Sequence, residues 1–482
     1  RMRRSPGFGA AVGPLGVEER VGGGERKVVG QERFHRHLDA FARGINEFAA
    51  AHPDAVDAEN RVVLPVSGVD VVGHPLRAVH YGYMGSLERM RREGDAMKRG
   101  AGTVADATNA DRDEFSAGSN TWAIGPAHSA SGRAMLLINP HLAWGNTFYR
   151  YMEMHLVGPN YDLYGAPQVG FPVPVVGFNR HAGWGRTVNT IDTVDFFNLT
   201  VKEGQYQFDG QLRPFERSSH TFKIKGADGT FAEETVEIRK SIHGPVVYDQ
   251  DGLTVAMRVA GLDRPRMLEQ WFKMGEATTL AQFQDALRIM AVPMWHANYA
   301  DDQGHVMFVF DGLVPRRNGR DYQYWSRVVA GDTSDTMWTD YLTFDELPKA
   351  VDPAIGWTQN TNQPPWDMTL PLLDRTKYAP YVAPSGEALP QMRTLRSRRM
   401  MTEDPKIGYE QLIAKKHSTR MELADRVLPD LLEAAKGSTE AAHGLERWDR
   451  MADADSRGAV LFQLFVDRYF AGAGGIAAKL RV

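Results

Sequence analysis

The chain has 482 residues, more than one compact core usually holds, which predicts a large domain or two intertwined ones. Its 43% hydrophobic and 24% charged residues are typical of a globular protein, and a formal net charge of −4 gives no basic excess for nucleic acid. The absence of cysteine excludes disulfides, thiolate metal sites and cysteine nucleophiles, and no apolar run has the length of a membrane span.

The first 118 residues read as helix and loop. Residues 1–30 are rich in Gly and Arg and are predicted to be loop; the chain starts at Arg1 without an export signal, so we expect an opening segment to be missing. Apolar residues at helical spacing predict a helix over 31–51, ended by His52-Pro53, and a second helical stretch covers 84–98. Residues 106–116 are polar and are predicted to form a spacer loop.

After residue 119 short β-rich runs come first and amphipathic helices later, which predicts an α+β fold of stacked antiparallel sheets flanked by helices. The predicted strands are Ala134–Ile138, Val173–Phe178, Phe196–Val201, Thr221–Lys225, Thr235–Arg239, Leu253–Val259 and Val306–Phe310. The predicted helices cover about 266–275, 279–291, 405–416, 421–436 and 458–470.

The stretch from Ala117 to Ala123 holds the most informative chemistry in the chain. Gly118 and Ser119 precede a short apolar run that reads as the start of a strand. Cleavage between them would leave Ser119 with a hydroxyl and a free α-amine, a nucleophile and its base in one residue. Because an α-amine titrates near pH 8, part of it is unprotonated at neutral pH. The same tripeptide is also ordinary turn chemistry.

The wider context resembles the penicillin acylase family of N-terminal nucleophile amidohydrolases, and within it the acyl-homoserine-lactone acylase and aculeacin acylase branch. The likeness runs from about Ser119 to Pro429. Its motifs are Gly118-Ser119-Asn120-Thr121-Trp122-Ala123-Ile124, Asn139-Pro140-His141-Leu142, Gly177-Phe178-Asn179-Arg180-His181, Gly183-Trp184-Gly185-Arg186-Thr187-Val188, Ile242-His243-Gly244-Pro245-Val246-Val247, Tyr299-Ala300-Asp301 and Gln359-Asn360-Thr361-Asn362.

The resemblance implies a four-layer αββα sandwich in which Ser119 opens a central strand. It implies a self-processing acylase, cut into an α-chain-like segment (1–118) and a β-chain-like catalytic domain (119–482) that stay together. It further implies no organic cofactor and a periplasmic or secreted location, and we expect the C-terminus to be incomplete as well. The leading substrates are N-acyl-homoserine lactones or related lipidic amides. A β-lactam acylase, or a non-catalytic relative that binds an acylated ligand, are the alternatives.

Attack on an amide develops an oxyanion that needs hydrogen-bond donors. By resemblance one donor is the backbone N–H of Val188, and the second is normally an asparagine side chain. Counting back from Asp301 places His296 at that position, where an imidazole supplies one N–H. Asn298, on the same strand face, is the alternative donor, and the alternative role for His296 is that of a hydrogen-bonded structural histidine.

Three further residues take roles from the resemblance. His141 stands where this branch has a histidine near the terminal amine, and either tunes that amine or is a satisfied core histidine. Arg317 aligns with an arginine that supports the active site, with surface solvation as the alternative. Asn360 lies in an amide-rich loop and is a candidate for contact with the substrate or with the residues that surround the substrate.

Asp192, Val194 and Asp195 offer two carboxylates and a carbonyl within four residues, an oxygen set that suits calcium. The resemblance implies a structural calcium on such an Asp-x-Val-Asp run, and solvated acids are the alternative.

Aliphatic residues at the expected acyl pocket separate the substrate classes. Leu142 stands where acylases that accept aromatic groups tend to place phenylalanine, and Val176 lies on the next expected pocket wall. Without rings to stack on, this pocket is expected to favour a flexible acyl chain, and the alternative is that other aromatic residues, such as Trp144 or Phe148, fill it.

Overall fold

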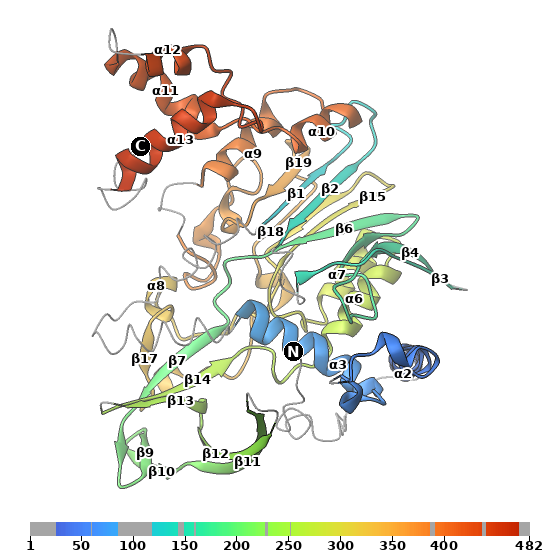
Figure 1. The fold of residues 1–482 in the computed structure, drawn as a ribbon, viewed down its shortest axis with the longest axis vertical. Helices are drawn as coiled ribbons and strands as arrows, with labels where there is room; N and C mark the ends of the chain where they lie inside the picture. The colour runs from blue at the N-terminus through green and yellow to red at the C-terminus, as the bar shows by residue number, and fades with distance from the viewer. Residues whose placement is uncertain are drawn as a thin grey trace.

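Four β-sheets and the helices packed on them make up the part of the chain that the computed structural model describes, residues 26–58, 60–84, 118–142, 149–158, 161–226, 230–250, 252–385, 391–435 and 440–471. The predicted helix over 84–98 and the spacer over 106–116 lie almost wholly outside these residues. The described chain therefore mixes helices and antiparallel sheets, which confirms the predicted α+β class (Figure 1).

Two of the sheets form the framework of the candidate site. One has three strands in the order β19-β1-β2, and the other has seven in the order β18-β16-β15-β6-β5-β4-β3. Their strands are β1 (Gly118–Ile124), β2 (Met135–His141), β19 (Trp357–Asn360), β3 (Met154–Gly158), β4 (Tyr161–Ala166), β5 (Val176–Phe178), β6 (Ala182–Thr187), β15 (His296–Asp301), β16 (Val306–Val309) and β18 (Lys349–Val351).

The remaining two sheets lie beyond the seven-stranded one, at the lower end of Figure 1. The larger has the order β11-β12-β13-β14-β7-β17, with β17 parallel to β7, and the smaller has the order β10-β9-β8. Their strands are β7 (Val194–Leu199), β8 (Val201–Lys202), β9 (Gln205–Phe208), β10 (Gln211–Pro214), β11 (Glu216–Lys225), β12 (Phe231–Ser241), β13 (Gly244–Gln250), β14 (Leu253–Val259) and β17 (Val328–Ala330).

The helices fall into three groups along the chain. The first group precedes β1, the second lies between β14 and β17, and the third follows β19 (Figure 1). The α-helices are α2 (Arg26–Ala51), α3 (Gly68–Arg77), α6 (Met267–Glu276), α7 (Leu280–Leu287), α8 (Tyr322–Trp325), α9 (Met392–Thr402), α10 (Tyr409–Lys416), α11 (Glu422–Ala434), α12 (Glu440–Glu446) and α13 (Arg457–Ala471), and α3 continues as a π-helical turn over Ala78–Met84.

Alternation along β1 places its side chains on two different surfaces. Ala123 packs with Ala300 and Val306 of the seven-stranded sheet, so Ser119 and Thr121 share that face. Trp122 and Ile124 pack instead with residues of α9 and α10, such as Met400. The three-stranded sheet is therefore buried on both faces, which explains why β1 reads as an almost unbroken apolar run after its polar start.

The two sheets pack tightly against each other at Gly185 on β6. A Cβ added there would lie 2.6 Å from Cγ1 of Ile138 on β2, closer than real side chains tolerate. Because glycine has no Cβ, the isoleucine packs directly against the β6 backbone. This contact holds β1 and β2 against β6 and β15, the two strands that carry the predicted oxyanion residues.

The first helices pack on the opposite side of the seven-stranded sheet, together with α6. Phe34 of α2 lies in the main hydrophobic cluster with its ring centroid 5.6 Å from that of Phe272 on α6. On the same helix, Arg33 pairs with Glu276 at 2.8 Å and His37 Nε2 lies 3.0 Å from the carbonyl of Pro172. The segment before Ser119 is thus held to the rest of the chain by packing and polar contacts.

Several predicted elements differ from the structure at points where proline or glycine intervenes. The strand predicted over Val173–Phe178 is reduced to β5, since Pro174 has no N–H for a ladder bond. The helix predicted from 405 starts at Tyr409, after Pro405 and Gly408. The helix predicted over 31–51 starts earlier, at Arg26, so the loop predicted to residue 30 is wrong for its last five positions.

Candidate active site

Ser119 lies at the start of β1 and is 4% exposed. The strand pairs with β2 from its first residue, with Gly118 opposite His141, but its pairing with β19 begins only at Thr121. On that side β19 ends at Asn360, so no strand backbone faces Ser119. The Ser119 N–H donates instead to the side chain of Asn362, whose Oδ1 lies 2.8 Å away.

Contacts with three neighbouring residues hold the side chain of Asn362 in one orientation. Its Oδ1 accepts from Ser119 N and from Arg393 Nη2, at 2.8 and 2.6 Å, and its Nδ2 donates to the carbonyl of Val188 at 2.7 Å. Arginine is only a donor and a carbonyl only an acceptor, which fixes the side-chain oxygen toward Ser119. The φ of Asn362 is +75°, a conformation that asparagine adopts more readily than most residues.

Asn360 supports this loop and does not reach Ser119 through any hydrogen bond of the described residues. Its Oδ1 accepts from Thr187 Oγ1 at 2.6 Å and from the backbone N–H of Asn362 at 2.8 Å. It is fully buried. Asn360, predicted to contact the substrate or the residues around it, therefore joins the end of β6 to the loop that carries Asn362.

Arg393, on α9, approaches the same point from the helix side. It donates to the carbonyls of Ser119, at 3.3 Å, and of Thr361, as well as to Asn362. A Cβ added at Gly118 would lie 2.5 Å from Arg393 Nη1 and 2.8 Å from Cε1 of His141, so only glycine fits before the serine. His141 and Arg393 thus flank the Gly118–Ser119 peptide bond.

The two predicted side-chain oxyanion donors lie on β15, as the sequence indicated, and both are fully buried. His296 Nε2 lies 3.2 Å from the carbonyl of Gln363, so this nitrogen carries the proton and donates it there. Burial lowers the pKa of His296 to about 3, which keeps the ring neutral, and the ring packs against Phe308. The only N–H of the neutral imidazole is therefore already engaged.

Asn298 makes no polar contact that would orient it toward Ser119. Neither its Oδ1 nor its Nδ2 has a hydrogen-bond partner among the described residues. Opposite it on β6 stands Gly185, where Ile138 packs against the β6 backbone. The contacts to Ser119 go instead to Asn362 and Arg393, which sequence reasoning did not single out.

Arg317 is buried and lies between the two predicted calcium ligands rather than on the surface. Its guanidinium contacts Oδ2 of Asp192 at 3.0 Å and both oxygens of Asp195 at 2.9 Å, and Trp338 Nε1 donates to Asp195 at 2.6 Å. Burial raises the pKa of the Asp195 carboxyl, and the neighbouring guanidinium opposes that rise. The alternative of solvated acids is wrong, because both carboxylates are buried.

As these side chains lie, they hold a guanidinium and do not fit a calcium ion. Calcium takes six to eight oxygen ligands, whereas the carboxylate oxygens here receive N–H donors. Val194 is buried in β7 between the acids. Among the described residues no group of three acidic or histidine side chains is placed to hold a metal. The predicted calcium requires Arg317 to leave the two acids.

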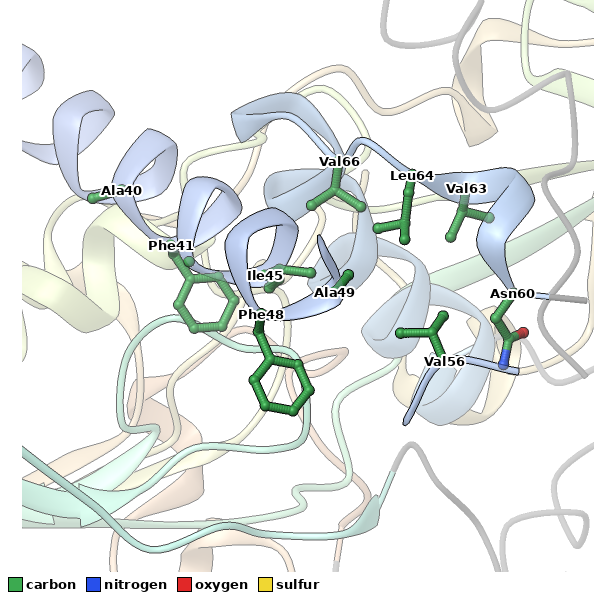
Figure 2. A pocket seen from close by; sticks show the side chains of 11 residues that line it. Ala40, Phe41, Ile45, Phe48, Ala49, Val56, Asn60, Val63, Leu64 and Val66 are labelled. Carbon is green, nitrogen blue, oxygen red and sulfur yellow. The ribbon is translucent and has the colours of Figure 1, made fainter. Parts of the chain in front are cut away.

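The two predicted pocket residues lie in different sheets. Leu142 directly follows β2 and is half-buried, and Val176 is buried on β5 of the seven-stranded sheet. Two cavities are lined by other residues. One, of about 610 Å³, is an apolar groove between α2 and the segment after it, with Phe41, Ile45 and Phe48 on its helix side (Figure 2). The other, of about 260 Å³, lies between the three-stranded sheet and α9.

Comparison with known proteins agrees with this framework. The model of the family described as penicillin amidase matches residues 24–475. The acyl-homoserine lactone acylase PvdQ of Pseudomonas syringae pv. syringae (strain B728a) is 31% identical over 405 residues, 77% of this chain and 52% of that protein. The penicillin G acylase of Escherichia coli is 26% identical over 347 residues, 69% of this chain and 39% of that protein.

A solved structure shows the same fold at lower identity. The thermostable penicillin G acylase from Alcaligenes faecalis superposes with a TM-score of 0.60 at 20% identity, covering 73% of this chain and 64% of that one. The chain spans about half the length of the PvdQ relatives that it matches. With a family model matched from residue 24 to residue 475, the chain belongs to the penicillin amidase family.

Proposed function

We propose that the chain is the core of an N-terminal serine acylase that hydrolyses the amide of an N-acylated small molecule. The observation that carries this proposal is the set of contacts around the Gly118–Ser119 bond. Ser119 is buried at the start of a central strand, and its nitrogen is held by Asn362 Oδ1, itself fixed by Arg393 and Val188. Such contacts keep a nitrogen in place whether it is an amide or a free amine.

Cleavage before Ser119 would convert that amide into the base of the reaction. The amine then takes the proton of its own hydroxyl through a water molecule as the hydroxyl attacks the acyl carbonyl. A covalent acyl-enzyme forms, the amine product leaves, and a second water releases the acid. His141, which faces Gly118 across the β1–β2 pair, is placed to influence this amine.

The oxyanion of that attack needs two donors near Ser119. We assign the side-chain donor to Asn362, because an amide nitrogen has two N–H groups and only one is used on the Val188 carbonyl. The backbone N–H of Val188 remains the proposed second donor. His296 is not assigned this role, since its single N–H lies on Gln363.

The leading substrates are N-acyl-homoserine lactones or related lipidic amides. PvdQ relatives at about 30% identity carry that activity in their names, and Leu142 and Val176 make the expected pocket wall aliphatic. A penicillin-type β-lactam acylase is the second candidate, favoured by the likeness to the penicillin G acylase of Escherichia coli.

The architecture supports the same assignment. We propose that α9 and α10, the three-stranded sheet, the seven-stranded sheet, and α6 with α7 are the four layers of an αββα sandwich (Figure 1). Cleavage would give an α-chain up to Gly118 and a β-chain from Ser119, held together by the contacts of α2. In the part of the chain that the structure describes, no helix is long and apolar enough to cross a membrane. A periplasmic or secreted location is proposed from the relatives.

The test is the mass of the complete protein after expression. We expect two chains whose second begins at Ser119, one uncut chain without acylase activity for Ser119→Ala, and normal cutting for Ser131→Ala, an exposed serine in the turn after β1. Normal cutting of Ser119→Ala would refute the proposal. An uncut wild-type protein that still hydrolyses acyl amides would refute the role of the free amine.

A further inference from the structure

The cavity behind the catalytic strand has a chemical character of its own. It lies on the face of β1 opposite Ser119, between the three-stranded sheet and α9, and its volume of about 260 Å³ is below the usual range for drug-sized ligands. Five basic side chains and one acid line it, the basic ones being Arg393, Arg396, Lys415, Lys416 and Arg420. A small anion therefore suits both its size and its charge.

Two of these five basic side chains are already paired with acids. Lys415 contacts Asp404 at 2.8 Å, and Arg420 contacts Asp425 at 2.7 Å. Glu422, the acid that lines the cavity, accepts from Arg399 and Arg426 at 2.8 and 3.0 Å. These ion pairs therefore already engage Lys415, Arg420 and the acid of the lining.

Arg396 differs from its neighbours. Its side chain is only 15% exposed, and its closest carboxylate, that of Glu403, is 3.9 Å away and is shared with Lys415. Its Nε is buried and has no hydrogen-bond partner among the described residues. A buried guanidinium without a close counter-charge is costly, and a bound anion would remove that cost.

The surroundings of Arg396 supply further donors. Arg393, one helical turn earlier on α9, lines the same wall. The floor is formed by Asn120 and Asn139, which face each other across the β1–β2 pair and offer amide N–H groups. Planar guanidinium groups and amides form the donor set that binds carboxylate and phosphate oxygens well.

We propose that this cavity binds a small oxyanion, a phosphate or a carboxylate, through Arg396 with Arg393 and the Asn120–Asn139 pair. The site lies on the face of β1 opposite Ser119, and it shares Arg393 with the contacts around Ser119. It requires neither chain cleavage nor acylase activity, and binding is measurable on the protein in either form.

The test compares three proteins in titrations with inorganic phosphate and with citrate at constant ionic strength. Tm and isothermal calorimetry are the readouts. We expect saturable binding to the wild-type protein and to Arg398→Gln, a change on the same helix away from the cavity, and at least tenfold weaker binding to Arg396→Gln. Arg396→Lys, which keeps the charge and loses the planar fork, should lie between them.

The two anions distinguish the source of the ligand. Tighter binding of phosphate assigns a phosphate site and tighter binding of citrate a carboxylate site. Binding that is equal in Arg396→Gln and Arg398→Gln would overturn the proposal, as would no saturable binding of either anion to the wild-type protein. If Arg396→Gln does not fold, Arg396→Lys and Asn120→Ala carry the comparison, with weaker binding expected for both.

Discussion

Two asparagines in the buried framework differ in what surrounds them, and the difference bears on catalysis. Asn362 contacts Ser119, Arg393 and Val188, whereas the amide of Asn298 has no hydrogen-bond partner among the described residues. A residue that orients the reacting nitrogen and donates to an oxyanion has to be held in one orientation. Only Asn362 meets that requirement.

We therefore expect Asn362→Ala to lower kcat by about 10²–10³ in the matured enzyme, as is typical for the loss of one oxyanion donor. Asn298→Ala is the matched control and should keep kcat close to that of the wild type. Steady-state kinetics on fully cut protein, with the cut fraction determined by mass, measures both. A larger loss in Asn298→Ala would reverse the assignment.

Arg317 supplies the positive charge between Asp192 and Asp195, and its removal takes the guanidinium counter-charge away from two buried carboxylates. We expect Arg317→Ala to lower the free energy of unfolding by about 3–5 kcal/mol. Added calcium should restore part of the loss in the variant, since the carboxylates then become available as oxygen ligands. Thermal denaturation with calcium and with chelator tests this. Equal stabilisation of the wild type would show that calcium binds beside Arg317.

Asp311 links stability to pH. It is fully buried, Gln270 Nε2 lies 3.5 Å from its Oδ2, and burial raises its pKa to about 8. With a folded pKa above the unfolded value, the folded state binds more protons, so the contribution to stability is present at low pH and is lost between about pH 4 and about pH 8. Asp311→Asn should flatten this dependence.

Denaturant titrations at pH 5 and pH 8 measure the effect of Asp311→Asn. The free energy of unfolding of the variant, relative to that of the wild type, should be higher at pH 8 than at pH 5. A difference independent of pH would show that Asp311 is ionised in the folded protein throughout this range.

At the scale of elements, the packing of the two central sheets depends on Gly185. A methyl group there meets Ile138 at 2.6 Å, whereas one at Gly183, on the same face of β6, first meets the flexible end of Leu136 at 3.2 Å. We expect Gly185→Ala to cost about 1–3 kcal/mol, as overpacking usually does, and Gly183→Ala to cost less. Urea denaturation of the two variants makes the comparison. Equal losses of stability in the two variants would show that the sheets move apart far enough to accommodate the methyl group at position 185.

Amphipathic helices and regular strands could be predicted from the sequence. β14 has the predicted bounds, and α13 differs by one residue at each end, because each has an apolar pattern that its packing uses. The helix α9 was not predicted, since its many arginines hide an apolar side that only Met400 and Met401 provide in the core. Because α9 was not predicted, Arg393 could not be recognised as a residue near Ser119.

The site residues show the same limit. Ser119 and His141 could be placed because a resemblance with ordered motifs fixes them in the chain. Asn362 stands two residues from Asn360 in one amide-rich run, and the sequence treats the two alike. They differ only after β19 ends at Asn360 and the chain turns through a positive φ at Asn362. The signal in the sequence that could have pointed to Asn362 was the Asn-x-Asn pattern that it forms with Asn360.

At the scale of the whole molecule, the proposed function predicts that the preferred substrate depends on how much acyl chain the protein buries. Aliphatic residues such as Leu142 and Val176 give no ring to stack on, so each buried methylene should contribute about 0.8 kcal/mol, or roughly fourfold in kcat/KM. We expect dodecanoyl amides to be hydrolysed faster than octanoyl amides of the same amine, and phenylacetyl amides more slowly than both. A preference for phenylacetyl would favour the β-lactam acylase.

The packing of α2 against α6 has a consequence for how the protein unfolds. Before cleavage, Phe34 and Arg33 are tethered to the catalytic strands by the backbone, and refolding is a reaction within one molecule. With the proposed cleavage before Ser119, the same contacts would join two chains, and denaturation would release a fragment that diffuses away. Recovery would then be second order in protein concentration, and the persistence of the cleaved protein would be governed by the rate at which α2 separates rather than by an equilibrium.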